Sequence, residues 1–179
     1  IVSAGALVVG GLDFDGVDDE FTITGMSSTF QNSQYAAAFT VVKCRSALSS
    51  TQPVFFAQAG ATSGVARVYL GQVGTNFSSA GRRLDADGFA QSTSAISTST
   101  SLLSGMSQWA DGDTQLAVNG SEKTATNYSS GAGSTSNTTS DVVTIGSLTS
   151  SVIDGFVGEL IVYASDQSAN RAAIETNIN

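Results

Sequence analysis

Short stretches in which apolar and polar residues alternate recur along this 179-residue chain. Residues 12–14 and 21–24 alternate in this way, and turn-forming residues at 15–19 separate them. A period of two places successive side chains on opposite faces of a strand, so it indicates half-buried β-strands. The chain is therefore predicted to fold mainly as short strands joined by turns. Further strands are expected at 39–44, 54–57, 65–70, 114–118, 122–126, 142–145 and 156–163.

The pattern becomes helical only after Tyr163. Ser165 or Asp166 is expected to cap a short helix, because a side-chain oxygen at that position accepts an orphan backbone N–H. Ile174 and Ile178 lie one helical turn apart and share a face. Many strands followed by one peripheral helix predict an all-β fold, an antiparallel two-sheet sandwich with a short C-terminal helix.

Two places in the sequence make sharper predictions about which side chains face the core. In the first hairpin, Phe14, Phe21 and Ile23 are expected to point inward, and the Asp15-Gly16 turn needs a left-handed backbone that glycine supplies. The last strand is apolar on both faces, so we expect the terminal helix to cover the second one. On this strand, one face carries Phe156, Leu160 and Val162, and the other carries Val157, Ile161 and Tyr163.

Charge and composition exclude several classes of function. The net charge is −8 with only seven basic residues, which disfavours binding to nucleic acid or to anionic lipid. No apolar run approaches the ~20 residues of a membrane helix, so no membrane insertion is expected. The length suits one domain over residues 1–179. Because no initiator Met is present, we expect that domain to be part of a longer chain.

The sequence lacks the residue combinations that common catalytic mechanisms need. There is no histidine and a single cysteine, Cys44, which lies in an apolar run and is expected to be a buried small side chain. A nucleophile would need an adjacent base. Glycoside hydrolysis needs two carboxylates flanking the bond, and the nearest grouping, Asp111-Gly112-Asp113, is typical of a turn. The chain is therefore predicted not to be an enzyme.

Three segments resemble the laminin G-like, concanavalin A-like domains. Residues 12–21 resemble the opening hairpin of that family, an apolar strand followed by Asp-Gly-x-Asp-Asp and an aromatic residue. Residues 107–120, which include Trp109 and end in Val-Asn-Gly, resemble its central hairpin. Residues 156–163 resemble its closing core strand, and residues 166–175 the segment that follows. The matches occur in the family order and span nearly the whole chain.

This resemblance implies a jelly roll of two curved sheets whose members bind glycans or proteins through loops at one rim. Residues 165–179 look most like the laminin G-like domains of bacteriophage structural proteins and bacterial surface proteins. The implied function is a virion structural module, such as a capsid decoration, head spike or tail-fibre domain that adheres to glycans. Capsid or fibre subunits would be its partners, with residues 1–9 and the terminal helix as the docking surface and a homotrimer as the assembly.

The alternative function is a carbohydrate-binding domain of a secreted or cell-surface bacterial protein. Either reading places the chain on a virion surface or in an extracellular setting. Glycan binding would require an exposed aromatic ring together with amide hydrogen-bonding groups. The candidates are Tyr128 with Asn127 and Asn137, which border or lie within the Ser/Gly/Thr-rich segment 129–140, and Trp109, for which a core position is the competing interpretation.

A calcium site is the other candidate. Asp15, Asp18 and Asp19 concentrate carboxylate oxygens in a short stretch, and calcium takes six to eight oxygen ligands. The spacing is not that of an EF-hand loop, and the competing interpretation is a solubilising turn. Asp13 is expected to point away from the face that Phe14 occupies. No other cofactor is expected.

Overall fold

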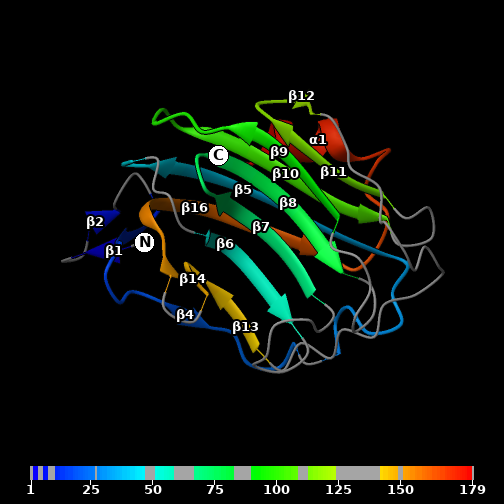
Figure 1. Cartoon of the computed structure of the whole chain (residues 1–179), viewed down its shortest axis with the longest axis horizontal. Coiled ribbons are helices and arrows are strands. Elements are labelled where there is room, and N and C mark those ends of the chain that lie inside the picture. The colour runs from blue at the N-terminus through cyan, green and yellow to red at the C-terminus, as the bar shows by residue number, and fades with distance from the viewer. Residues whose placement is uncertain are drawn as a thin grey trace.

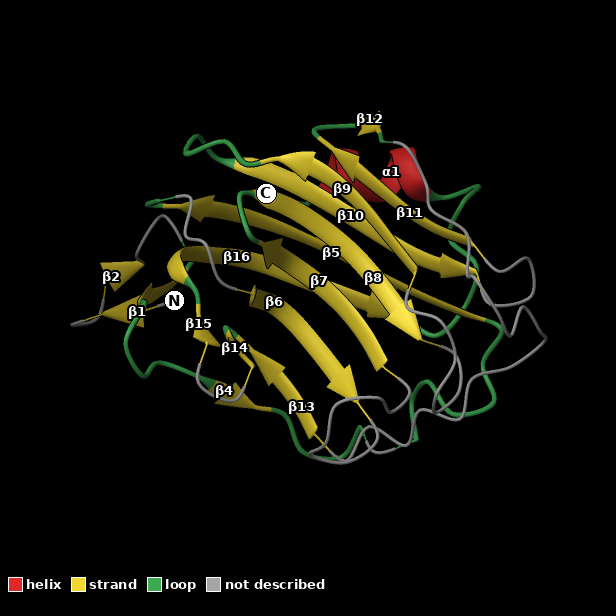
Figure 2. Ribbon diagram, in the orientation of Figure 1, coloured by secondary structure: helices red, strands yellow, loops and turns green. Residues whose placement is uncertain are grey.

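The computed structural model describes residues 2–3, 6–7, 11–26, 28–46, 51–58, 67–82, 90–108, 113–123, 142–148 and 151–178. Apart from one helix at the C-terminal end, its regular elements are strands (Figure 2). No helix in these segments is long and apolar enough to cross a membrane. The elements are β1 (Val2–Ser3), β2 (Ala6–Leu7), β3 (Leu12–Asp15), β4 (Phe21–Thr22), β5 (Tyr35–Cys44), β6 (Thr51–Gln58), β7 (Arg67–Val73), β8 (Asn76–Arg82), β9 (Ala90–Ala95), β10 (Ser101–Gln108), β11 (Asp113–Val118), β12 (Ser121–Glu122), β13 (Val142–Ile145), β14 (Ser147–Leu148), β15 (Ser151–Val152), β16 (Asp154–Tyr163) and α1 (Arg171–Asn177).

Two antiparallel six-stranded sheets form the body of the molecule. The helix-covered sheet has the order β12-β11-β10-β5-β16-β3, and the opposite sheet has the order β4-β13-β6-β7-β8-β9. Figure 1 looks through the stack, with β6 and β7 in front of β5 and β16. Small two-stranded pairs, β1-β2 and β14-β15, flank the sheets. The predicted all-β, two-sheet sandwich with one short C-terminal helix is confirmed.

The main core lies between the two sheets. Phe14, Phe55 and Phe77 are fully buried there, together with Cys44, as predicted for this cysteine. Aromatic rings fill the space between the layers because each buries a large apolar area. The same alternation that located the strands in the sequence therefore delivers alternate side chains into one shared interior.

The first hairpin differs in one respect from its prediction. Phe14 is buried, and Ile23 packs against the core. Phe21, however, is 49% exposed, although its ring packs edge-to-face on that of Phe14 with 6.0 Å between centroids. Phe21, expected to point inward, is thus only partly covered, because β4 is a two-residue strand at the edge of its sheet. An edge strand has a neighbour on one side only.

The last strand, β16, contains a bulge that the period-two pattern does not reveal. Its register with β5 shifts between Val157 and Leu160. As a result Val157 is in the core with Leu160 and Val162. Phe156, expected on that face, instead lies beneath the guanidinium of Arg45. A bulge adds one residue to one strand, so every side chain before it changes face relative to those after it.

The terminal helix α1 covers the outer face of the helix-covered sheet, as predicted. Ile174 and Ile178 pack with Phe39, Ile161 and Tyr163 in a second apolar cluster, and in Figure 1 α1 lies behind β10 and β11. This apolar stripe is therefore used within the chain. The apolar face of the helix is therefore not available to a partner as part of the predicted docking surface.

The start of α1 also differs from the prediction. The helix begins at Arg171, with Asn170 as its N-cap residue. Asp166 instead accepts a hydrogen bond from the backbone N–H of Ser168 at 2.8 Å, so it closes the turn that precedes the helix. The Asn119-Gly120 turn between β11 and β12 has positive φ at both residues, 51° and 76°, as a type I′ hairpin requires.

Candidate functional site

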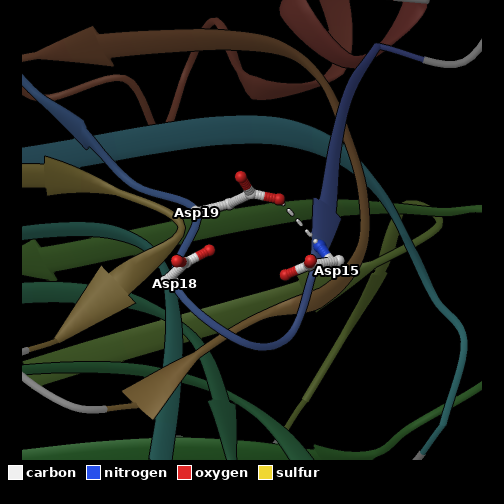
Figure 3. A group of neighbouring side chains, drawn as sticks. All are labelled: Asp15, Asp18 and Asp19. Atoms are coloured by element: carbon white, nitrogen blue, oxygen red, sulfur yellow. Dashed lines mark hydrogen bonds between the residues drawn. The ribbon is translucent and has the colours of Figure 1, made fainter.

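The acidic turn, defined here as residues 15–19, connects β3 to β4. Gly16 has a φ of 79°, which lets the chain reverse without a steric penalty. The carboxylate of Asp15 accepts a hydrogen bond from the N–H of Val17 at 2.8 Å, and that of Asp19 accepts one from the N–H of Asp15 at 3.0 Å. Figure 3 shows the second of these bonds closing the loop. The aspartates thus stabilise the turn that carries them.

The three aspartates predicted as metal ligands are brought together by this turn. One oxygen from each of Asp15, Asp18 and Asp19 lies within 4.8 Å of the others, and the carboxylates face a common space (Figure 3). Two of their oxygens already accept backbone hydrogen bonds, whereas none of the described residues donates one to Asp18. The donor set suits a hard cation such as calcium, but three carboxylates fill only part of its coordination shell.

Asp13 is not part of this group, and it points away from the face that the buried Phe14 occupies, as predicted. Arg45 pairs with Asp13 and, at 3.1 Å, with Asp154, and donates to the carbonyl oxygen of Phe14 at 2.7 Å. Its guanidinium carbon lies 4.6 Å from the ring centroid of Phe156. Hydrogen bonds to Asp13 and then Asp154 raise the pKa of Arg45. This network joins β3 and β16 to the end of β5.

Two apolar side chains are exposed beside the acidic turn. Val17 is 74% exposed at the tip of the turn, and Phe21 follows on β4. Sequence reasoning missed the exposure of Phe21, because the alternation gives its side but not the length or edge position of β4. An exposed aromatic ring near carboxylates is one of the combinations that can contact a sugar.

The residues predicted to bind glycan belong to segments outside those that the structure describes. Trp109, Asn127, Tyr128 and Asn137 all lie outside the described residues. Trp109 directly follows Gln108, the last residue of β10. These four assignments therefore stay predictions.

Three polar residues share one register position on the opposite sheet, where the structure describes their backbone. Gln58, Arg67 and Arg82 occupy one register row across β6, β7 and β8; we call this set the arginine row. The arginines are 15 positions apart in the sequence, and the turn at Gly74 brings them level.

The next row on the same face contains buried residues. Tyr69 and Ala80 pair across β7 and β8, and both are buried in a small cluster with Val73 and Leu148. The hydroxyl of Tyr69 donates to the carbonyl oxygen of Gln72. Burial raises the pKa of Tyr69 well above its ordinary value. The arginine row therefore adjoins a packed aromatic residue.

No protein-family model matches the sequence, and no curated protein matches it either. Solved structures do share its fold. The CBM40 module of the Ruminococcus gnavus IT-sialidase, bound to α2,3-sialyllactose, superposes with a TM-score of 0.69 at 12% identity, covering 93% of this chain and 96% of that one.

Two animal proteins show the same architecture. Domains LG4-5 of the mouse laminin α1 chain give a TM-score of 0.65 at 11% identity over 94% of this chain and 46% of theirs, so this chain spans about half of that structure. The SAP-like pentraxin of Limulus polyphemus gives 0.61 at 14% identity, over 90% of this chain and 78% of that one. The chain is thus similar in fold to carbohydrate-binding and laminin G modules, and its sandwich is a jelly roll of the concanavalin A-like kind.

Proposed function

We propose that this chain is a non-catalytic glycan-binding module that acts in an extracellular setting. The observation that carries the proposal is the extent of the likeness to the sialidase module, which is solved with a sialylated sugar. It covers nearly all of both chains, so one whole module corresponds to another. At 12% identity the likeness establishes the fold, and glycan binding is our inference from it.

The surface chemistry of the described residues supports this proposal. Glycan sites combine a ring that packs on the sugar face with a few polar groups that fix orientation. Phe21 offers a half-exposed ring near the acidic turn, whose clustered carboxylates can accept hydrogen bonds from sugar hydroxyls.

The proposal that the module is non-catalytic rests on the protonation states that hydrolysis needs. A glycosidase keeps one carboxylic acid protonated, usually by burying it, beside a second that is ionised. The clustered carboxylates of Asp15 and Asp18 are exposed. The chain has no histidine, and burial raises the pKa of Cys44 to about 11. Neither residue type supplies a general base here.

A virion setting, capsid or fibre partners and a homotrimer remain predictions from the resemblance of residues 165–179. They are compatible with glycan binding, because a surface module of a particle can also adhere to sugars. Light scattering of the purified chain would give its assembly state, and mass spectrometry of purified particles would show whether it is a virion component. Calcium at the acidic turn is a separate prediction.

A glycan array probed with the purified, fluorescently labelled chain tests the proposed function. We expect binding to a related subset of glycans, inhibited by the same sugars in free form. Incubation of those sugars with the protein should leave them intact by mass spectrometry. A folded chain, verified by circular dichroism, that binds none of the arrayed glycans would contradict the proposal, and cleavage would contradict its non-catalytic part.

A further inference from the structure

Among the described strands, β9 (Ala90–Ala95) is the outermost one of the opposite sheet, at the end away from β4 (Figure 1). The other outermost strands are protected in two of the ways that proteins use for sheet edges, which are shortness and charge. β4 and β12 contain two residues each, and β3 contains four, which include Asp13 and Asp15. β9 contains six residues and has no charge or proline. It is therefore the least protected of the four edges.

The register of β8 and β9 indicates which backbone groups face this edge. Just beyond β9, the N–H of Ile96 donates to the carbonyl oxygen of Thr75 at 3.1 Å, and the two residues lie opposite each other in the continued register. In an antiparallel pair, residues that exchange hydrogen bonds alternate with residues that do not. Every second residue counted back from Ile96 therefore bonds to β8, and the residues between direct their N–H and C=O groups outwards. These outward-facing residues are Gln91, Thr93 and Ala95.

Charge favours a second copy of the chain as the partner of this edge. The chain carries a net charge of −8, so two copies repel each other over most of their surface. Residues 88–110, which include β9, contain no Asp, Glu, Lys or Arg. If β3 paired with itself, aspartates would lie near aspartates, and like charges in opposition destabilise a sheet. When β9 pairs with itself, only uncharged side chains lie opposite each other, of which Thr93 and Ala95 are exposed.

We propose that β9 pairs antiparallel with β9 of a second copy of this chain across a twofold axis. With the axis at Thr93, this residue lies opposite Thr93 of the second copy, and Gln91 lies opposite Ala95. The residues opposite each other are then those that direct N–H and C=O groups to the free edge, so each such pair exchanges hydrogen bonds. Opposed threonines are a favourable cross-strand pair. The edge is thus complementary to itself in this register.

This pairing makes a dimer. A twofold axis uses the same edge in both copies, so the assembly closes at two. The homotrimer predicted from the resemblance requires a contact between two different surfaces instead. The inference is independent of the proposed glycan binding, because it rests on backbone groups of β9 and involves no sugar.

Analytical ultracentrifugation of the purified chain over a range of concentrations tests the proposal. We expect a monomer–dimer equilibrium in the wild type. Thr93→Pro removes the outward N–H from both copies, so it deletes two hydrogen bonds of the interface and should raise the dissociation constant by at least about tenfold. Proline is tolerated in an edge strand where the N–H faces away from the sheet, so the variant should remain folded by circular dichroism. Thr98→Pro, at an exposed position between β9 and β10, is the matched control and should dimerise as the wild type does.

Lysine substitutions provide a second readout that does not depend on proline. Thr93→Lys places two ammonium groups opposite each other in the dimer and should weaken it. Thr98→Lys adds the same charge away from the edge and lowers the net negative charge of each copy, so it should leave dimerisation unchanged or strengthen it. The position of the added charge, and not the charge alone, therefore decides the result.

A wild-type chain that sediments as a monomer at every concentration would overturn the proposal, and so would a trimer. A dimer that both Thr93 substitutions leave as tight as the wild type would also overturn it, because the interface would then lie elsewhere. Weakening of the dimer in both Thr93 variants, with both Thr98 variants at least as dimeric as the wild type, supports it.

Discussion

Glu175 of α1 accepts a hydrogen bond at 2.7 Å from the hydroxyl of Ser104, which lies on β10 in the sheet beneath the helix. The same carboxylate is 3.8 Å from Arg171, which also pairs with Glu122 at 3.1 Å. Such polar contacts fix the position of the helix, but partly exposed ion pairs add little to stability. The apolar contacts beside them should therefore dominate the free energy of docking.

Replacement of Ile178 by alanine should lower the free energy of unfolding by roughly 2–4 kcal/mol, the usual cost of truncating a buried isoleucine. Ile178 is only 6% exposed and packs with Ala37, Phe39 and Met106. Urea denaturation measures the change. Ala173→Gln, on the exposed side of the same helix, is the control and should change stability by less than about 0.5 kcal/mol. Equal effects of the two substitutions would mean that the helix contributes no docking energy.

The Arg45 network predicts a salt-dependent loss of stability. Arg45→Gln should lower the melting temperature, because Asp13 and Asp154 then repel each other near Asp15, the register partner of Asp154. The loss should be larger at low ionic strength, where repulsion is less screened. Differential scanning calorimetry at two salt concentrations measures it.

Two further substitutions separate the causes of that loss. Arg45→Lys keeps the charge but loses the stacking on Phe156 and the two-nitrogen fork of the guanidinium. Its melting temperature should therefore lie between those of the wild type and Arg45→Gln. Lys43→Gln removes an exposed charge two residues earlier and should have little effect. If Arg45→Gln and Lys43→Gln melted alike at both salt concentrations, the network would not stabilise the fold.

At the acidic turn, aspartate substitutions distinguish a calcium site from a self-stabilised turn. Without calcium, Asp15→Ala should lower the free energy of unfolding by about 0.5–1.5 kcal/mol. This is the usual contribution of a hydrogen bond such as the one that Asp15 accepts from the N–H of Val17. Asp18→Asn should be neutral or stabilising, because it relieves repulsion among the three carboxylates. Denaturant titrations in the presence of a chelator measure both effects.

With millimolar calcium, the wild type should melt at a higher temperature, since a ligand that binds the folded state stabilises it. Asp18→Asn should lose this increase while folding normally. Asp166→Asn, which alters an exposed carboxylate near the helix, should keep it. A wild-type melting temperature that does not respond to calcium would leave the aspartates with their role in the turn alone.

Sequence alternation predicted the strands well where a strand is regular and has neighbours on both sides. Residues 39–44 and 142–145, for example, lie within β5 and coincide with β13. It failed at Phe156, because the bulge in β16 changes which residues share a face and leaves no mark in the spacing of apolar residues. It failed at Phe21 because exposure there depends on the edge position of β4.

The polar clusters differ in the same way in how far the sequence could predict them. Asp15, Asp18 and Asp19 could be grouped from the sequence, since they belong to one turn and local geometry brings them together. Arg45 and Asp154 could not be grouped by proximity in sequence, since only the pairing of β16 with β5 makes them neighbours. Sites assembled from separate strands require the pairing of those strands before any spacing rule applies.

Cys44 predicts how stability should change at alkaline pH. Burial, with a smaller contribution from the charge of Asp154, raises the pKa of this thiol from 9.0 to about 11. The folded state therefore keeps its proton in a range where the unfolded state loses it. Stability from this group is complete below pH 9 and is lost as pH rises towards 11, because the unfolded state then binds fewer protons.

The expected loss is roughly 3 kcal/mol over that window, at 1.36 kcal/mol for each pH unit between the two pKa values. Urea denaturation at intervals from pH 8 to 11 measures it, with Cys44→Ala as the control. The buried Tyr69 also has a raised pKa and contributes a decline in both proteins, so the difference between their slopes isolates the thiol. The alanine variant should start less stable, from the lost side-chain packing, and decline less steeply. Parallel curves would mean that the Cys44 thiol ionises alike in the folded and unfolded chains.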